Sequence, residues 1–319
     1  MRGRAARLWP PRWVPRLPPS PRSSVPALPE NEAPPAARRK SGDLLPRLVT
    51  ALVLGPLLLA AAIVGPNLLV WLIVVVAALI GNLEYTRMTV ANGRARLVRG
   101  VSAVGTVATL SLLYWVDPEA AVMAFAACLL GVMLAELATV RDPRHSAGRI
   151  GGGLSGFVYA TVLFGSLLVL AQGEHPGETA PHQGGWFMFP MFVVWMGDTG
   201  AYFAGRAFGK RKLAPVVSPG KSWEGAAGGL VASVVGGYLC WWLLLDGAGV
   251  AAWHVLLFAV PGAILGQLGD LCESLIKRST GFKDSGAILY GHGGMLDRVD
   301  ALLFAAPWFV LVKSLLDLG

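Results

Sequence analysis

The sequence predicts an all-α fold: a polytopic integral membrane helical bundle of about nine transmembrane helices, with the N-terminus in the cytoplasm. The 319 residues are 54% hydrophobic and only 14% charged, whereas soluble domains carry about 25% charged residues. Apolar segments long enough to cross a bilayer recur along the chain. Basic residues fall in every second connection between these segments, which is typical of proteins that cross a membrane several times.

The N-terminal segment differs from the rest of the chain. Residues 1–43 are rich in proline and arginine and contain no long apolar run. Such a composition buries too little apolar surface to fold, so we predict a disordered cytoplasmic tail. We divide the remainder into N-terminal transmembrane helices, 44–185, and a C-terminal transmembrane region, 186–319, where the candidate chemistry is concentrated.

Nine apolar segments follow the tail, and we expect each to form a membrane-spanning helix. Several contain glycine and alanine, which favour close contact between helices in a bilayer. The predicted spans are 46–64, 67–83, 100–116, 119–139, 151–171, 186–204, 224–245, 254–276 and 299–317.

The distribution of charge sets the predicted orientation. No lysine or arginine occurs in the odd-numbered connections, 65–66, 117–118, 172–185 and 246–253, whereas all the even-numbered ones are basic. The positive-inside rule then places the N-terminus and the basic connections in the cytoplasm. The net charge of +8 is therefore interpreted as a topology signal and as affinity for anionic lipid or phosphate, with no nucleic acid as partner.

Acidic residues inside predicted spans are costly and indicate function. Asp198 lies near the cytoplasmic end of the sixth span. Asp270 and Glu273 lie near that end of the eighth, spaced so that they share a helix face. Asp297 and Asp300 open the ninth span with the same spacing. Three helices are thus expected to bring five carboxylates to one depth, an arrangement that suits Mg²⁺.

Basic residues and glycines flank these carboxylates. Ser218, Lys221 and Ser222 lie between the sixth and seventh spans, where Pro219-Gly220 predicts a turn that lets Ser218 and Lys221 converge on one ligand. The connection before the ninth span contains Lys277, Arg278, Lys283, His292, Gly293, Gly294 and Arg298. Glycines there let backbone amides approach an anion closely.

Carboxylates that hold a metal, together with cations and amides that hold phosphate, are the recurring parts of phosphoryl and nucleotidyl transfer. A phosphate nucleophile is already ionised, so such a reaction needs positioning more than a strong base. His292 is accordingly expected to orient a ligand or to bind phosphate. Other charges have simpler interpretations: Glu84, Glu136 and Asp317, at span ends, are assigned to stabilising ion pairs.

The C-terminal motifs carry a family resemblance. They comprise Ser274-Leu-Ile-Lys277-Arg278, Lys283-Asp284, His292-Gly293-Gly294 and Asp297-Arg298-Val-Asp300, preceded by Asp198-Thr-Gly-Ala-Tyr202 and Ser218-Pro-Gly-Lys-Ser-Trp-Glu-Gly225. Over residues 195–300 the chain resembles the CDP-diacylglycerol synthase (phosphatidate cytidylyltransferase) family. Tyr290 stands where that family usually has proline.

The resemblance implies transfer of the cytidylyl group of CTP to phosphatidate, with release of pyrophosphate, dependence on Mg²⁺, and a homodimer. It leaves room for a second, monovalent cation, and it implies a multi-pass protein of the cell membrane that acts on the cytoplasmic face. By position, Asp270 and Asp297 would be metal ligands, supported by Asp198, Glu273 and Asp300. Catalysis would also use Lys277, Arg298 and His292. The residues that would bind CTP or lipid phosphate are Ser218, Lys221, Ser222, Arg278, Lys283, Gly293 and Gly294.

Two other functions stay open at this point. A related membrane nucleotidyl- or phosphotransferase acting on another lipid phosphate or on a lipid alcohol would use the same residues, because these address phosphate and metal. An ion-coupled transporter would also need intramembrane carboxylates, but here they gather at one end of the spans, and we find no internal repeat of the kind that many transporters have.

Overall fold

The computed structural model describes residues 60, 67–90, 95–172, 182–286 and 293–318. The predicted tail, nearly all of the first predicted span, and the residues Tyr290 and His292 therefore lie outside the described part of the chain. Each predicted span from residue 67 onward coincides with an α-helix. The helices are α2 (Asn67–Thr89), α3 (Arg96–Trp115), α4 (Pro118–Thr139), α5 (Ser146–Leu170), α6 (Gln183–Phe208), α7 (Trp223–Leu244), α8 (Ala252–Ser279) and α9 (Leu296–Leu315).

The prediction of a multi-pass membrane protein is confirmed. Within the described residues, six helical segments are long and apolar enough to cross a bilayer: α2, α3, α4, α7, α8 and α5 together with the short 3-10 helix Pro143–His145 that precedes it. The helices α6 and α9 also lie where spans are predicted, and they carry Asp198, Asp297 and Asp300.

Helix starts follow from local chemistry. Asp117 caps α4 by accepting a hydrogen bond from the backbone N–H of Ala120 (2.6 Å), with Pro118 in the first turn. This arrangement satisfies an N–H group that the helix itself leaves unpaired. Ser222 caps α7 in the same way, through the N–H of Gly225 (3.1 Å).

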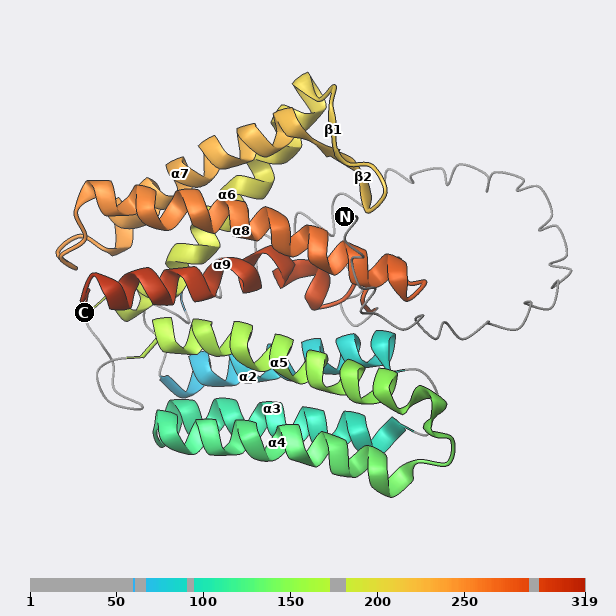
Figure 1. The fold of residues 1–319 in the computed structure, drawn as a ribbon. Coiled ribbons are helices and arrows are strands. Elements are labelled where there is room, and N and C mark those ends of the chain that lie inside the picture. Colours follow the sequence, from blue (N-terminus) through green and yellow to red (C-terminus); the bar gives the residue numbers. More distant parts are fainter. Residues whose placement is uncertain (1–59, 61–66, 91–94, 173–181, 287–292, 319) are drawn as a thin grey trace, which may run out of the picture. The chain divides into compact units, whose positions relative to one another are not determined.

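The helices pack in two neighbouring groups (Figure 1). The first contains α2, α3, α4 and α5, and α5 also packs against α9 of the second, which contains α6, α7, α8 and α9. In the core of the second group, tilted and T-shaped ring contacts join four aromatic side chains: Trp186, Phe189, Phe258 and Phe309. The helices α6 and α7 form a tight hairpin, in which a methyl group at Gly229 would lie 3.0 Å from the Cβ of Ala201. Such small residues allow the two backbones to approach closely.

A two-stranded antiparallel sheet departs from the all-α prediction. Strands β1 (Lys212–Ala214) and β2 (Ser218–Ser222) project from one end of the α6–α7 hairpin (Figure 1). The predicted turn at Pro219-Gly220 is wrong, because the turn is formed by residues 215–217. Pairing of Lys212 with Ser222 and of Ala214 with Ser218 leaves Pro219-Gly220 in an irregular stretch of β2. A proline has no N–H to donate, and it is tolerated in such an irregular stretch because no regular ladder hydrogen bond is required there. Pro215, in contrast, presets the backbone for the turn.

Candidate active site

The candidate site is a cluster of carboxylates and lysines supplied by α6, β2, α8 and α9. Lys277 Nζ lies 2.7 Å from Glu273 Oε2 on its own helix and 2.6 Å from Asp297 Oδ1 on α9. All three side chains are largely buried. A buried lysine is tolerated where carboxylates satisfy its donors and balance its charge. The prediction that the carboxylates of these two helices converge is therefore supported by direct contacts.

A second ion pair joins the hairpin to α8. Lys221 Nζ, on β2, lies 2.6 Å from Asp270 Oδ2, and both side chains are partly exposed (25% and 33%). Asp198, on α6, is close enough to both groups for their charges to interact. An ion pair that remains accessible to solvent can exchange its partner for a ligand at little cost, since exposed pairs contribute about 0–1 kcal/mol.

The two ion pairs belong to one electrostatic cluster. Asp300 lies within electrostatic range of both Asp270 and Glu273, and its Oδ1 accepts a hydrogen bond from the N–H of Ala301 (2.7 Å). The hydroxyl group of Tyr159, on α5, is buried and lies in the field of Glu273 and Asp300. The cluster thus extends from the partly exposed Asp270 to the buried interior between α5, α8 and α9.

The chemistry of these donors fits a divalent cation. The carboxylates around Asp270 are hard oxygen ligands whose negative charges repel one another, which is the donor set that Mg²⁺ and related ions select. Among the residues that the structure describes, no three carboxylate, histidine or cysteine side chains are arranged to coordinate one ion. Instead, the ammonium groups of Lys221 and Lys277 contact Asp270 and Asp297, the two predicted metal ligands.

Asp297 also binds two backbone segments that precede it in the chain. Its Oδ2 accepts hydrogen bonds from the N–H groups of Ser285 and Gly294, each at 2.9 Å. Gly293 adopts φ = +80°, a left-handed conformation that glycine adopts at little cost. The amide of Gly294, predicted to bind a phosphate, is therefore directed at an anion of the protein itself.

One acidic residue outside this cluster, Glu84, contacts the start of α9 and differs from the sequence-based expectation. Glu84, on α2, is 3% exposed and accepts hydrogen bonds from the N–H groups of Met295 and Leu296 and from the hydroxyl group of Ser285. The prediction that Glu84 forms an ion pair is wrong, because the groups that donate hydrogen bonds to it are backbone N–H groups and a hydroxyl group. Glu136 confirms the same expectation, since it pairs with Arg149 at 2.6 Å. The signal in the sequence was a glutamate directly after the predicted span 67–83, and the structure places it inside α2.

The remaining predicted residues have distinct surroundings. The hydroxyl group of Ser222 is buried and caps α7, and Ser218 begins β2 opposite Ala214. The cations predicted to bind phosphate near α8 and α9 are exposed: Arg278, Lys283 and Arg298. Their exposure leaves them accessible to a polyanion at the protein surface.

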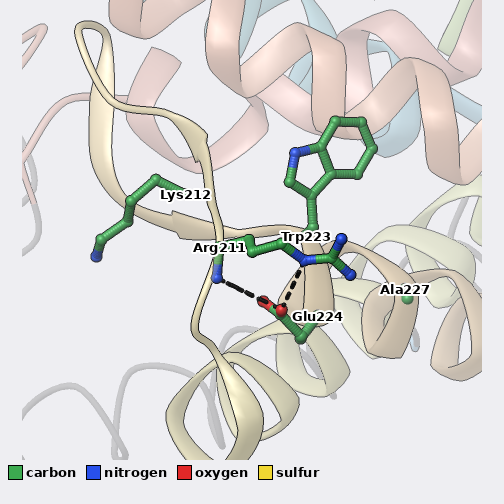
Figure 2. A pocket seen from close by; sticks show the side chains of 5 residues that line it. All are labelled: Arg211, Lys212, Trp223, Glu224 and Ala227. Carbon is green, nitrogen blue, oxygen red and sulfur yellow. Dashed lines mark hydrogen bonds and ion pairs between the residues drawn. The ribbon is translucent and has the colours of Figure 1, made fainter.

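A separate hollow of about 600 Å³ lies beside the hairpin, lined by Arg211, Lys212, Trp223, Glu224 and Ala227. Figure 2 shows the Arg211 side chain turned toward Glu224, whose carboxylate accepts hydrogen bonds from the Arg211 backbone N–H (3.2 Å) and Nε (3.4 Å). This carboxylate also accepts from the N–H of Lys210 (3.1 Å). Glu224 thereby fixes the start of the hairpin relative to α7, next to the strand that carries Lys221.

Comparison with known proteins identifies relatives over most of the chain. The model of the cytidylyltransferase family matches residues 45–316. A phosphatidate cytidylyltransferase of Brucella suis is 36% identical over 280 residues, which cover 86% of this chain and 94% of the relative. One of Pseudomonas aeruginosa is 38% identical over 271 residues, covering 82% and 94%. One of Haemophilus influenzae is 46% identical over 134 residues, covering 40% and 46%.

Proposed function

Because the chain belongs to the cytidylyltransferase family, we propose that it transfers the cytidylyl group of CTP to phosphatidate, giving CDP-diacylglycerol and pyrophosphate. One observation carries this proposal: carboxylates and lysines from α6, β2, α8 and α9 form a single cluster. This cluster lies in a chain whose helices are long and apolar enough to cross a membrane. Phosphate-bearing substrates, one of them a lipid, match both features.

The reaction is a displacement at phosphorus. An oxygen of the phosphatidate phosphate attacks the α-phosphorus of CTP, a new phosphoanhydride bond forms, and the bond to the β-phosphate oxygen breaks to release pyrophosphate. The attacking phosphate is already ionised at neutral pH. The protein therefore contributes orientation and neutralisation of charge, which dominate catalysis of phosphoryl-type transfers.

The lysines would carry much of this neutralisation. Lys221 is paired with the partly exposed Asp270, so an arriving phosphate can take over the ammonium group. Arg278, Lys283 and Arg298 lie exposed and would bind the triphosphate or the lipid phosphate. Lys277 is enclosed between Glu273 and Asp297, and its role would be to hold those carboxylates in place and to add positive charge beneath the substrates.

A divalent cation completes the proposal. Mg²⁺ held by Asp270 and Asp297, with Asp198, Glu273 and Asp300 nearby, would supply further neutralisation of the triphosphate and of the leaving pyrophosphate. The number of cations, including a second, monovalent one, is decided by titration of the purified protein. His292 would orient a ligand, and the backbone amide of Gly293 would face anionic oxygens of a substrate, whereas the amide of Gly294 donates to Asp297.

The site belongs on the cytoplasmic face in this proposal. The positive-inside rule supports this orientation, because the connections that flank the site contain Lys210, Arg211, Lys283 and further basic residues. We further propose nine spans, a cytoplasmic tail formed by residues 1–43, N-terminal helices over 44–185, a catalytic region over 186–319, residence in the cell membrane, and a homodimer.

The test is incorporation of labelled CTP into chloroform-soluble lipid by the purified full-length chain in detergent. Label should appear in lipid only when both phosphatidate and Mg²⁺ are present. Other nucleotides, other lipid phosphates and lipid alcohols serve as competing substrates. Equal or better transfer with one of these, or no transfer by a monodisperse preparation, would overturn the assignment.

A further inference from the structure

The contact of Glu84 with the start of α9 joins segments that are more than 200 residues apart in sequence. Glu84 Oε1 accepts a hydrogen bond from the N–H of Met295, and Oε2 accepts from the N–H of Leu296, both at 3.0 Å. The hydroxyl group of Ser285 donates to the same Oε2 at 3.1 Å. One carboxylate thus satisfies three donors while remaining almost fully buried.

A carboxylate suits this position for two physical reasons. The first N–H groups of a helix have no partner within the helix, and the N-terminal end carries a partial positive charge. Met295 and Leu296 provide these N–H groups for α9. A glutamine at position 84 would present one oxygen and one NH₂ group, so an N–H donor would face another donor. Removing an acceptor from buried donors is costly.

Ser285 links Glu84 to Asp297 through hydrogen bonds. The backbone N–H of Asp297 donates to the Ser285 hydroxyl oxygen (3.4 Å), and that hydroxyl group in turn donates to Glu84. Asp297 Oδ2 accepts from the N–H of Ser285, and Oδ1 contacts Lys277. Glu84 therefore contacts Ser285 and the two residues that precede Asp297, which are all held in one network of hydrogen bonds.

The backbone on both sides of this connection packs closely against Glu84. A methyl group at Gly294 would lie 2.6 Å from Glu84 Oε2, and one at Gly286 would collide with Glu84 Oε1. The glycines on both sides of the connection thus allow the backbone to close onto this carboxylate. A shift of Glu84 would consequently displace the backbone that carries Gly294 and Asp297.

We propose that Glu84 is a positioning residue for Asp297: it anchors Ser285 and the first turn of α9 so that the Asp297 carboxylate is directed at Lys277 and the substrate site. This inference rests on the proposed function for its kinetic consequence, but not for its structural one. It assigns a role in the reaction to α2, a helix that contributes none of the predicted site residues.

The matched control is Glu136→Gln. Glu136, on α4, is also a glutamate with 3% exposure, and it is held by Arg149 and Ser146. Its partners do not belong to the cluster around Asp297. Both substitutions remove one buried negative charge, so they separate a general loss of stability from a specific effect on the site.

The experiment combines kinetics with amide hydrogen exchange on the full-length protein in detergent. In Glu84→Gln, the kcat for cytidylyl transfer should fall about 100-fold, because displacements near 1 Å have effects of this size, while the KM for CTP changes little. Exchange at the amides of Met295 and Leu296 should accelerate. Exchange at Ser285 and Gly294, whose acceptor is Asp297, should accelerate as well. Glu136→Gln should leave kcat and these four amides unchanged.

The exchange data distinguish positioning from simple capping. Faster exchange at Met295 and Leu296 with unchanged protection of Ser285 and Gly294 would overturn the proposal, as would a kcat equal to that of the wild type. Glu84→Asp retains the charge and should recover part of the kcat. If Glu84→Gln does not fold, Ser285→Ala breaks the bridge while leaving the cap, and a wild-type kcat in that variant would equally contradict positioning.

The two proposals fail separately. Wild-type protein that transfers no cytidylyl group to phosphatidate would overturn the proposed function. The exchange at Ser285 and Gly294 in Glu84→Gln would still test the positioning role.

Discussion

Lys221 Nζ lies 2.6 Å from Asp270 Oδ2, and this ion pair joins the β1–β2 hairpin to α8. The lysine comes from a strand and the aspartate from a long helix, so their distance depends on how the hairpin is placed against the bundle. Because both side chains are partly exposed, the pair is accessible to a phosphate group that arrives from solvent.

Replacing Lys221 by methionine is expected to raise the KM for CTP or phosphatidate at least tenfold, because a phosphate would lose a cation partner, with a smaller loss of thermal stability. Initial rates over a matrix of both substrate concentrations provide the measurement. The control is Lys212→Met, which removes an exposed lysine from the facing strand. Equal effects of the two substitutions would show that only the overall charge of the hairpin matters.

Asp270→Asn and Asp297→Asn are each expected to reduce turnover at least 100-fold while the protein still inserts and remains monodisperse. Each substitution removes the negative charge of a carboxylate that we assign to the metal and replaces one of its oxygens by an NH₂ group, which cannot bind a cation. Chelation of divalent cations should abolish transfer by the wild type, and added Mg²⁺ should restore it. Full activity in either variant would refute the metal assignment for that residue. Asp246→Asn, outside the cluster, serves as control.

Lys277→Met is expected to destabilise the protein by about 3–5 kcal/mol, because it leaves two buried carboxylates without their cation. The double variant Lys277→Met/Glu273→Gln should recover part of this loss, since one of the unpaired charges is removed. Unfolding in detergent, followed by circular dichroism, measures both effects. If the double variant were no more stable than the single one, the pairing of Lys277 with Glu273 would contribute little.

Ser222→Ala is expected to lower the stability by about 1 kcal/mol, the usual cost of losing an N-cap. Ser222→Thr retains the cap and should restore it. Thermal unfolding and the KM for CTP are measured together. A large rise in KM without a change in unfolding temperature would instead favour the predicted contact of this hydroxyl group with phosphate.

Local patterns explain why much of the architecture was predictable. Helix positions from α2 to α9 follow from runs of apolar residues, and a helix in a bilayer needs only its own residues to satisfy its backbone. The spacing of three between Asp270 and Glu273 places them on one face of any helix. Their relation to Lys277 on that same helix, at 2.7 Å for Glu273, depends on the same local geometry.

The hairpin shows where local reasoning failed. Pro219-Gly220 has the composition of a turn, yet the partner strand Lys212–Ala214 and the turn after it place these two residues within β2. Proline and glycine indicate that the hydrogen-bond ladder between two strands is interrupted. Either a turn or a bulge can cause such an interruption. Only the pairing of strands distinguishes the two.

The sequence by itself thus determined where the membrane-crossing helices lie and that the carboxylate-rich motifs fall within the C-terminal region. Each helix and each motif is recognised from residues that are close together in the chain. Tertiary structure alone decided that Lys221 meets Asp270, that Lys277 meets Asp297, and that Glu84 caps α9. These contacts join residues up to 212 positions apart. Their geometry is set by how whole helices pack, which no local pattern records.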